Sequence, residues 1–425
     1  MKSQKPREIA LNVLLQRESG AHYTENLLDR SLADAQLASA DRALCRELVS
    51  GCVRWQLTLD ELIDRRTDGR RQPTAVRALL RLGLYQLVFL TKIPPHAAVH
   101  ETVSLAAGAG CTRQKGFINA VLRHYGRELD ATRDLLVQLQ ETDPRLGYSH
   151  PAWLVERWTR DFGAEKTRRL LEWNNQPPAT FARVNTLKTS AADLARRWTD
   201  SEGVEFEPVR FDWLPDELFF QLKSNPPLPQ MESFRDGWFY IQDPSTALAC
   251  TLLDPRPGES ILDYCAAPGG KTTLLAQMAD DQAEIVAQDH HHKRLRLIRE
   301  NCQRLGVRGV SPLITSVERD AALGDQRFDK ILLDVPCSNT GVMRRRIDLR
   351  WRLSEDEIMR LTETQRTLLD EARAWLKPGG RIIYSTCSID PVENIGVTGE
   401  QPTARQLTPF DDGCDGAYAC VIEPG

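Results

Sequence analysis

No apolar run in the 425-residue sequence reaches the ~18 residues that a membrane-spanning helix requires. The basic stretch from Met1 to Arg7 is not followed by a long apolar segment, so we do not expect a secretory signal. The ten cysteines never stand at C-x-x-C spacing, which argues against a metal ribbon and against a disulfide framework. These absences predict a cytoplasmic protein that has no membrane partner and no bound metal.

Strong net charge is also missing, but the small value of -4 hides an asymmetry. Residues 1–130 carry a net charge of +5, and residues 131–425 carry -9. A basic module on an acidic remainder indicates an anionic partner for the module, although an ordinary solvated surface explains so small an excess equally well. Length and composition, with 41% hydrophobic and 27% charged residues, are those of a soluble multidomain protein.

The first part of the chain is expected to be helical. In residues 1–130, apolar residues such as Ile9, Val13 and Leu14 recur at helical spacing. Residues 131–178 continue as a helical connector, and residues 179–245 mix strand and helix periods, which predicts a small α+β module. The helical part also contains four clustered arginines, which either grip phosphates or belong to a solvated loop: Arg65, Arg66, Arg70 and Arg71.

Strands and helices alternate in residues 246–425. Expected strands lie at 260–264, 284–289, 310–315, 329–334 and 380–385, and expected helices include 292–305 and 354–375. The second helix opens with a capping box, Ser354-x-x-Glu357. Strands separated by helices predict a mostly parallel, doubly wound sheet of the Rossmann-like α/β class.

A glycine turn lies between the first strand of this sheet and the helix after it. Gly269 and Gly270 allow a ligand to approach the backbone, and the helix N-terminus that follows favours a nucleotide-like group. Asp289 ends the next strand, 20 residues after Gly269, where a carboxylate accepts hydrogen bonds from ribose hydroxyls. The alternative is an ordinary tight turn and a surface aspartate.

Two further strands each run directly into a cysteine. Ile331-Leu332-Leu333-Asp334-Val335-Pro336 leads to Cys337, and Ile382-Ile383-Tyr384-Ser385-Thr386 leads to Cys387. Thiolates are strong nucleophiles, and strand ends at a cleft expose them. A single such cysteine is best interpreted as a small buried hydrophobe, but two at the ends of strands in one sheet favour catalysis.

These motifs together resemble those of a known enzyme family. Asp263-x-Cys265-Ala-Ala-Pro-Gly-Gly-Lys271-Thr272, Asp334-x-Pro-Cys337 and Ser385-Thr386-Cys387-Ser388 resemble the S-adenosylmethionine-dependent RNA 5-methylcytosine methyltransferases. Residues 1–130 resemble the RNA-binding domain of the NusB type, most specifically in Lys115-Gly-Phe-Ile-Asn119-Ala-Val-Leu-Arg123. The combination resembles the bacterial RsmB (Sun/Fmu) branch, which methylates small-subunit ribosomal RNA.

The resemblance implies roles for particular residues. It makes Cys387 the nucleophile that attacks carbon 6 of cytosine, and Cys337 the residue that assists product release. DNA cytosine methyltransferases use the Pro-Cys cysteine as nucleophile, so the reversed assignment stays open. Asp334 would hydrogen-bond the cytosine edge, and Lys271 would place positive charge near the site unless it merely starts the helix.

The family's cofactor site maps onto ten residues of this chain. They are Cys265, Ala266, Ala267, Pro268, Gly269, Gly270, Lys271, Asp289, Ser316 and Asp334. Ser316 is a departure, because Thr315-Ser316 stands where the family usually has an acidic residue near the adenine. Arg344-Arg345-Arg346 is expected to contact RNA phosphate, and His290-His291-His292 is interpreted as a solvated helix start rather than a metal site. The chain after Asn394 is shorter than usual, with Gly413 to Tyr418 resembling the terminal strand.

The resulting expectation is a cytoplasmic, monomeric enzyme that uses S-adenosylmethionine to methylate carbon 5 of a cytidine in 16S ribosomal RNA. Two alternatives remain at this point. One is a methyltransferase acting on transfer RNA or DNA. The other is a ribosome-assembly or antitermination factor that binds RNA without catalysis, although Cys337, Cys387 and Asp334 argue against it.

Overall fold

The computed structural model describes residues 5–315 and 318–422, and the chain forms two compact units. One unit consists of Met1–Gln176 together with Arg346–Arg352, and the other consists of Pro177–Arg345 together with Leu353–Gly425. The chain therefore leaves the second unit once, contributes a seven-residue segment to the first, and returns.

The described part of the first unit is helical, as predicted. Its helices are α1 (Pro6–Arg17), α2 (Thr24–Ala33), α3 (Ser39–Arg54), α4 (Gln56–Thr67), α5 (Thr74–Phe89), α6 (Pro95–Ser104), η1 (Thr112–Gln114), α7 (Lys115–Arg127), α8 (Leu129–Thr142), α9 (Pro144–Gly147), α10 (Ala152–Phe162), α11 (Ala164–Asn175) and α18 (Leu349–Arg352). Helix α5 is apolar on nearly every side, and most of its residues are buried, which is the pattern of a central helix. Glycine allows α3 to approach it closely, because a Cβ on Gly51 would lie 1.8 Å from the Tyr85 ring.

The segment Arg346–Arg352 is held in this unit by buried polar contacts. Asp348 accepts hydrogen bonds from the backbone N–H and the hydroxyl of Thr24, and it pairs with Arg17 at 2.9 Å. Arg350 is fully buried, and its guanidinium donates to the carbonyl oxygens of Arg54, Ser149 and Asn174. These contacts satisfy carbonyl groups that would otherwise be buried without a partner.

The second unit contains a small antiparallel sheet and a large mixed sheet. The small sheet has the order β2-β3-β1-β4. Its elements, including the helices beside it, are β1 (Thr180–Val184), α12 (Ala191–Arg197), η2 (Trp198–Glu202), β2 (Glu205–Pro208), β3 (Phe219–Ser224), η3 (Leu228–Gln230), α13 (Glu232–Arg235) and β4 (Phe239–Ile241). Trp198 lies at the centre of its core, with Phe206, Phe220 and Phe239 rings 5.2–5.6 Å away in tilted or edge-on contact.

The large sheet has the order β10-β11-β9-β8-β5-β6-β7. The elements of this part are η4 (Pro244–Thr246), α14 (Ala247–Leu253), β5 (Ser260–Asp263), α15 (Gly270–Met278), β6 (Glu284–Asp289), α16 (His292–Leu305), β7 (Val310–Thr315), α17 (Arg319–Leu323), β8 (Phe328–Asp334), η5 (Thr340–Val342), α19 (Glu355–Arg373), β9 (Leu376–Thr386), α20 (Ile395–Thr398), β10 (Arg405–Leu407), α21 (Pro409–Asp412) and β11 (Ala417–Ile422). Strands β7, β6, β5, β8 and β9 are parallel, and β10 and β11 are antiparallel additions. The predicted strands and both predicted helices are present within a few residues of their expected ends.

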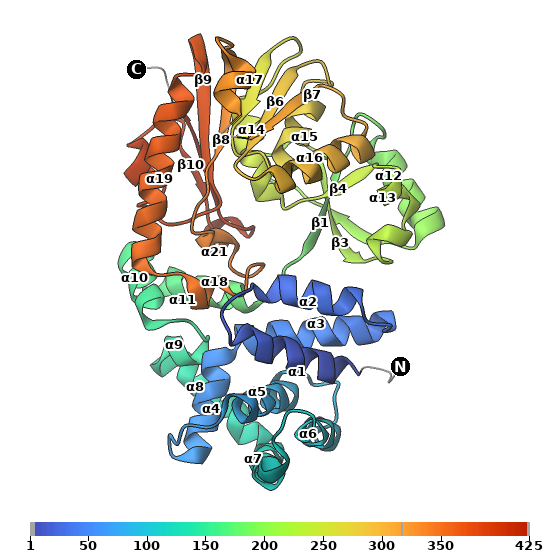
Figure 1. Cartoon of the computed structure of the whole chain (residues 1–425), viewed down its shortest axis with the longest axis vertical. Coiled ribbons are helices and arrows are strands. Elements are labelled where there is room, and N and C mark those ends of the chain that lie inside the picture. The colour runs from blue at the N-terminus through green and yellow to red at the C-terminus, as the bar shows by residue number, and fades with distance from the viewer. Residues whose placement is uncertain (1–4, 316–317, 423–425) are drawn as a thin grey trace. The chain divides into compact units, whose positions relative to one another are not determined.

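Helices cover both faces of the large sheet, which confirms the doubly wound class. Alternate strand residues point to opposite faces, so Ile261 and Ile285 pack with α14, α15 and α16, whereas Leu262 and Val286 share a core with α19. Figure 1 shows α19 on one side of the strands and α15 and α16 on the other.

The shortened tail still completes the sheet. Strand β11 pairs antiparallel with β9, and its Tyr418 lies opposite Thr386, next to Cys387. The terminal strand lies a few residues later than Gly413–Tyr418, since it begins at Ala417. Strand β9, which ends one residue before Cys387, is therefore interior to the sheet and paired on both sides.

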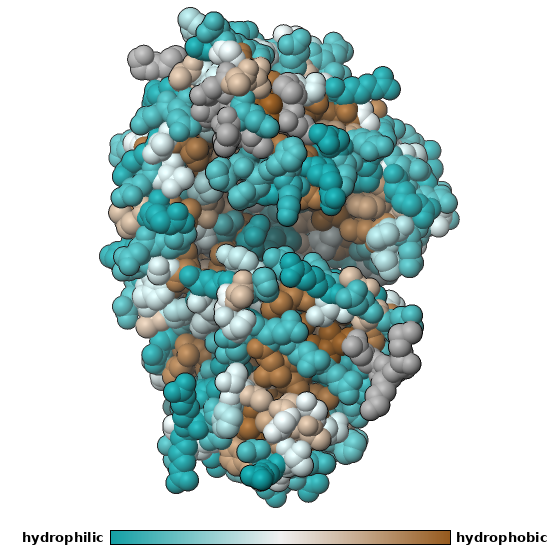
Figure 2. Space-filling model, viewed as in Figure 1, coloured by the Kyte–Doolittle hydropathy of each residue, from teal (hydrophilic) through white to brown (hydrophobic). Residues whose placement is uncertain are grey.

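Hydrophilic residues dominate the face seen in Figure 2, with apolar patches over the N-terminal helices. Within residues 5–315 and 318–422, no helix combines the length and the apolar character that crossing a bilayer requires.

We predict that Asp348→Ala destabilises the helical unit, because it leaves the nearly buried Arg17 guanidinium without its carboxylate. Breaking a buried pair in this way costs about 3 kcal/mol. Denaturant-induced unfolding measures the loss. Asp130→Ala is the matched control, since the Asp130 side chain is 97% exposed although it also pairs with an arginine. Equal midpoints for the two variants would show that Asp348 does not hold the segment.

Candidate active site

Three neighbouring parallel strands, β8, β5 and β9, end at one edge of the large sheet. The loop after β5 leads to Lys271, β8 ends at Asp334, and the residue after β9 is Cys387. The chain proceeds from β5 to β6 and β7 on one side and returns to place β8 on the other. This edge is therefore the topological switch point, where open α/β sheets bind their ligands.

The loop between β5 and α15 is tightly turned. The N–H of Gly269 donates to the carbonyl oxygen of Ala266, and the N–H of Ala266 donates to that of Gln288 on β6. Gly269 has φ +96°, and a Cβ there would lie 3.2 Å from Ile298, so another residue would be both strained and crowded. Glycine at position 269 is thus required by the local backbone geometry.

Asp289 lies at the end of β6 and is almost completely buried. One carboxylate oxygen accepts the N–H of Ala267 at 3.1 Å, and the other accepts the N–H of His291 at 3.1 Å. Arg294 lies 3.3 Å from the second oxygen. An ionised carboxylate has about four acceptor positions, so Asp289 retains capacity for a further donor while its side chain is fixed beside the glycine loop.

Asp263, the last residue of β5, is fully buried below this loop. The hydroxyl of Thr272 donates to its Oδ2 at 2.6 Å, and Oδ1 has no hydrogen-bond partner among the described residues. Burial raises the pKa of Asp263 to about 7, against the opposing effect of the Thr272 hydrogen bond.

Arg183 of the small sheet stabilises the start of α15. Its buried guanidinium donates to the carbonyl oxygen of Gly270 at 2.7 Å and to the hydroxyl of Thr273 at 3.0 Å. Burial lowers the pKa of Arg183 to about 10, so the side chain stays charged at neutral pH. The small module therefore supports the glycine loop directly.

Lys271 and Asp334 form an ion pair across the switch point. The Lys271 Nζ lies 2.6 Å from Asp334 Oδ1, and the Ser385 hydroxyl donates to the same oxygen at 2.7 Å. Burial favours the neutral amine, but Asp334 outweighs burial and raises the pKa of Lys271. Because both partners use Oδ1, Asp334 Oδ2 is left to accept a hydrogen bond from a ligand.

The two predicted cysteines lie in contact. Their Sγ atoms are 3.3 Å apart, although the residues are 50 positions apart in the chain. Cys337 is 8% exposed and Cys387 is more accessible, at an intermediate level of exposure. The hydrogen bond with Cys387 and burial both raise the pKa of Cys337, so this thiol stays protonated at neutral pH. Asn339 holds the pair, since its Oδ1 accepts from Cys387 Sγ at 3.0 Å and its Nδ2 donates to the Cys337 carbonyl.

A buried glutamate joins the two cysteine loops. Glu393 Oε1 accepts the N–H of Ser338 at 2.8 Å, and Oε2 accepts the hydroxyls of Ser338 and Ser388. Ser338 follows Cys337, and Ser388 follows Cys387. Burial raises the pKa of Glu393, whereas the serine hydrogen bonds lower it. One carboxyl group therefore fixes the residue after each cysteine.

Two of the predicted phosphate contacts turn out differently. Arg344 and Arg345 both pair with the buried Asp415, and Arg345 also pairs with Asp243 at 2.7 Å, so two of the three arginines expected to contact RNA are held inside the unit. Ser316 lies outside the described residues, and so does its expected contact with adenine. No group of three or more His, Cys, Asp or Glu residues in the described part of the chain is arranged to hold a metal ion.

The strand ends of the candidate site were predictable from the sequence, but the residues that support them were not. Glu393 stands in the stretch Pro391-Val392-Glu393-Asn394, where a lone acidic residue just after a strand end was the available signal. Arg183 stands in a strand-like run, where a charged residue facing a core was the signal. Neither signal identifies a partner, because both partners come from distant parts of the chain.

Three family models match this chain. The 16S rRNA methyltransferase RsmB/F model matches residues 250–408, the NusB family model matches residues 4–127, and the ferredoxin-like domain of RsmF/B-like methyltransferases matches residues 150–217. The first match spans the glycine loop, both cysteines, Asp334 and Glu393.

Similar proteins extend over most of the chain. The probable ribosomal RNA small subunit methyltransferase B of Synechocystis is 35% identical over 391 residues, which cover 91% of this chain and 86% of the relative. The ribosomal RNA small subunit methyltransferase B of Escherichia coli is 38% identical over 408 residues, covering 91% and 92%. The crystal structure of a methyltransferase homolog protein from Pyrococcus horikoshii is 31% identical and superposes with a TM-score of 0.56, covering 66% of this chain and 97% of that one.

Asp263 makes stability depend on pH. Its pKa is raised from 3.8 to about 7 on folding, so between these values the folded carboxyl keeps a proton that the unfolded one has lost, and stability falls as the pH rises from about 4 to about 7. Asp263→Asn should therefore gain stability relative to the native chain between pH 4 and pH 8, by on the order of 4 kcal/mol. Unfolding curves across this range measure the effect. Asp280→Asn, an exposed position after α15, is the control, and parallel pH profiles for all three proteins would contradict the prediction.

Glu393 is expected to set the distance between the cysteine sulfurs. Glu393→Ala leaves the two serine hydroxyls without their acceptor, so the cysteine loops should separate while the sheet remains folded. The rate at which diamide oxidises the Cys337–Cys387 pair to a disulfide reports this distance. We expect a fall of about tenfold or more, equivalent to about 1.4 kcal/mol. Glu363→Ala, on the exposed side of α19, should leave the rate unchanged, and a similar rate in both variants would refute the role of Glu393.

Proposed function

The chain belongs to the RsmB/F family of 16S rRNA methyltransferases, and we propose that it methylates carbon 5 of a cytidine in 16S ribosomal RNA through a covalent adduct with Cys387. The observation that carries this proposal is the contact between the Cys337 and Cys387 sulfurs, 3.3 Å apart beside Asp334 and next to the glycine loop. A ribosomal RNA substrate implies that the enzyme works in the cytoplasm.

S-adenosylmethionine is the methyl donor of this family. The residues present fit such a ligand. Gly269 and Gly270 carry no side chain that would block the loop backbone, and Asp289 keeps acceptor capacity beside the loop. We assign the ligand to the loop from Cys265 to Lys271, to Asp289 and to Asp334. When bound there, it supplies a methyl group activated by a positively charged sulfur.

Nucleophilic catalysis explains why a cysteine is needed. Carbon 5 of cytosine is a poor nucleophile, but a bond between the Cys387 Sγ and carbon 6 shifts the electrons of the 5,6 double bond onto carbon 5. Carbon 5 then accepts the methyl group. Loss of the carbon 5 proton to solvent water restores the double bond, and the bond between sulfur and carbon 6 breaks to return the Cys387 thiolate.

Accessibility and hydrogen bonding support Cys387 rather than Cys337 as the nucleophile. Cys387 is the more accessible of the two, and Asn339 orients its sulfur. Cys337 is buried with a raised pKa, so it remains a thiol that can donate a hydrogen bond to Cys387 once that thiol has given up its proton. From this position it can also return a proton when the adduct breaks down, which is the assistance with release expected from the sequence.

Asp334 is suited to orient the cytosine ring. Lys271 and Ser385 hold its Oδ1, while Oδ2 can accept a hydrogen bond from the exocyclic amine or from a protonated ring nitrogen. An accepting carboxylate stabilises the protonated ring nitrogen, and that proton offsets the negative charge that the ring gains when the sulfur attacks. The target base must leave its stack to reach this position, so an unpaired or strained nucleotide is the expected substrate.

The two cysteines have different proposed roles, so substituting each one should have a different effect on the covalent RNA–protein complex. Without Cys337, attack and methyl transfer still occur but elimination stalls, so Cys337→Ala should accumulate an RNA–protein complex that survives denaturing electrophoresis. Cys387→Ala and the double variant should form no complex and should methylate at least 1,000-fold more slowly, corresponding to about 4 kcal/mol of transition-state stabilisation.

Cys302→Ala controls for loss of a buried thiol elsewhere in the same unit. A complex formed by Cys387→Ala but not by Cys337→Ala would reverse the assignment. Mapping 5-methylcytosine in 16S ribosomal RNA after reaction with the native enzyme tests the position of the methyl group, and a product methylated at any other atom would overturn the proposed reaction.

A further inference from the structure

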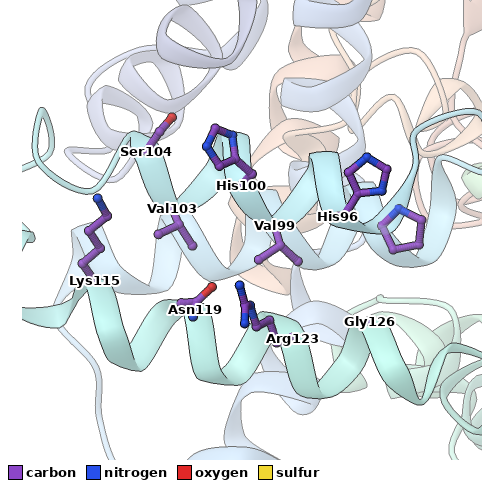
Figure 3. Close-up of a pocket in the computed structure, with 10 residues that line it drawn as sticks. His96, Val99, His100, Val103, Ser104, Lys115, Asn119, Arg123 and Gly126 are labelled. Carbon is purple, nitrogen blue, oxygen red and sulfur yellow. The ribbon is translucent and has the colours of Figure 1, made fainter.

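Helices α6 and α7 enclose a groove in the helical unit, and none of the residues that line it is assigned to catalysis. Figure 3 shows the two helices side by side, with polar side chains along both rims. The ten lining residues are Pro95, His96, Val99, His100, Val103, Ser104, Lys115, Asn119, Arg123 and Gly126. None of the ten is acidic.

The rims have the same periodicity. On α6, His96, His100 and Ser104 are four residues apart, and on α7 the same interval separates Lys115, Asn119 and Arg123. Residues four apart lie on one face of a helix, about 6 Å from each other along the axis. The groove therefore presents two parallel rows of polar groups.

The floor between the rows is apolar. It consists of Val99 and Val103, which are buried against the core of the unit. Gly126 leaves the end of the groove near His96 without a side chain from α7 (Figure 3). A ligand that combines charged groups with less polar surface suits such a groove better than a free inorganic ion does.

The positive charges of the groove are not used by the fold. Lys115 and Arg123 are exposed, and neither forms an ion pair with any described residue. Only one rim group has an acidic neighbour, since His100 Nδ1 lies 3.7 Å from Glu101, a carboxylate that also faces Lys5 at 4.0 Å. The donors of α7 are therefore available to an anionic ligand.

Two of the four clustered arginines differ from Lys115 and Arg123, because they pair with carboxylates. Arg65 pairs with Glu61 at 2.7 Å, and Arg66 pairs with Glu128 at 3.2 Å. An RNA phosphate would have to displace these carboxylates, whereas Lys115 and Arg123 have none to displace. Two of the four clustered arginines are thus poorer phosphate ligands than their charge alone indicates.

We propose that the α6–α7 groove binds the sugar–phosphate backbone of the RNA substrate. Lys115 and Arg123 contact phosphates, and Asn119, His96 and His100 donate hydrogen bonds to phosphate or ribose oxygens. The valine floor contacts the less polar sugar faces. The inference rests on the proposed function for the identity of the ligand, but it uses none of the residues assigned to catalysis.

Charge reversal in the groove tests the proposal. Lys115→Glu/Arg123→Glu in the full chain should weaken binding of purified 16S ribosomal RNA at least tenfold. The slope of log affinity against log salt should become shallower by about 1.4, because two phosphate contacts at about 0.7 each are lost. In methylation assays the KM for RNA should rise while kcat stays within twofold, since no catalytic group has changed.

Arg46→Glu/Arg133→Glu is the matched control, because it makes the same change in charge at two exposed residues of the same unit. It should lose less than threefold in affinity and keep its salt slope. Lys115→Gln/Arg123→Gln, which adds no repulsion, should reproduce the shallower slope with a smaller loss of affinity. Unchanged slopes in both groove variants would overturn the proposal.

Competition separates RNA from an acidic protein as the occupant. Poly-glutamate peptide that binds the native chain but not the charge-reversed one, while RNA binds both equally, would assign the groove to a protein and refute the inference. RNA binding is measured without catalysis. The native enzyme could fail to methylate carbon 5 while the groove variant still shows the expected loss of RNA affinity. That result would refute the proposed reaction and leave the groove assignment supported.

Discussion

The register between β8 and β9 is the constraint on which the candidate active site depends. Asp334 pairs directly with Ser385 in this parallel ladder. Cys337 follows Asp334 by three residues and Cys387 follows Ser385 by two, so the register brings the two sulfurs to the same place. A shift of one residue would turn every side chain of one strand to the opposite face and separate them. Because β11 pairs with the other side of β9, hydrogen bonds fix the position of β9 on both of its sides.

The cysteine loop is fixed at both ends by charge. Glu393 holds its beginning at Ser338, and Asp415 holds its end at Arg344 and Arg345. The next residue, Arg346, begins the segment that belongs to the helical unit, where Asp348 and Arg350 are buried. The loop bearing Cys337 is thus continuous in the chain with a segment whose position depends on the fold of the other unit.

Periodicity and turn chemistry were sufficient to predict most of the fold. The strand 284–289 and the helix 292–305 begin and end as expected, because their apolar residues, the glycine after the helix and the strand propensities all agree. The common position of Lys271, Asp334, Cys337 and Cys387 was also predictable, since strands of a parallel sheet end at a common edge. Local sequence determines these features, so no knowledge of distant contacts was needed.

Contacts between distant residues were not predictable. Arg344 and Arg345 were expected to face RNA because three consecutive arginines usually lie at a surface. Two aspartates instead neutralise these arginines. They are Asp415 and Asp243, which lie 70 and 102 positions from Arg345 in the chain. Glu393, Arg183 and the segment Arg346–Arg352 were missed for the same reason. In each case the partner that gives the residue its role is set by tertiary structure rather than by sequence spacing.

The same reasoning changes how charge identifies a nucleic-acid surface. The helical unit owes its basic character partly to Arg77 and Arg81, yet these side chains share Asp60 and pair further with Asp64 and Glu18. Such arginines stabilise the bundle, and an exposed ion pair offers little to a phosphate because its carboxylate must first be displaced and rehydrated. Lys115 and Arg123 contribute only two charges, but they are spaced two helical turns apart on one face and lack internal partners. Unpaired charge at regular spacing is therefore a better guide to the RNA-binding surface than net charge.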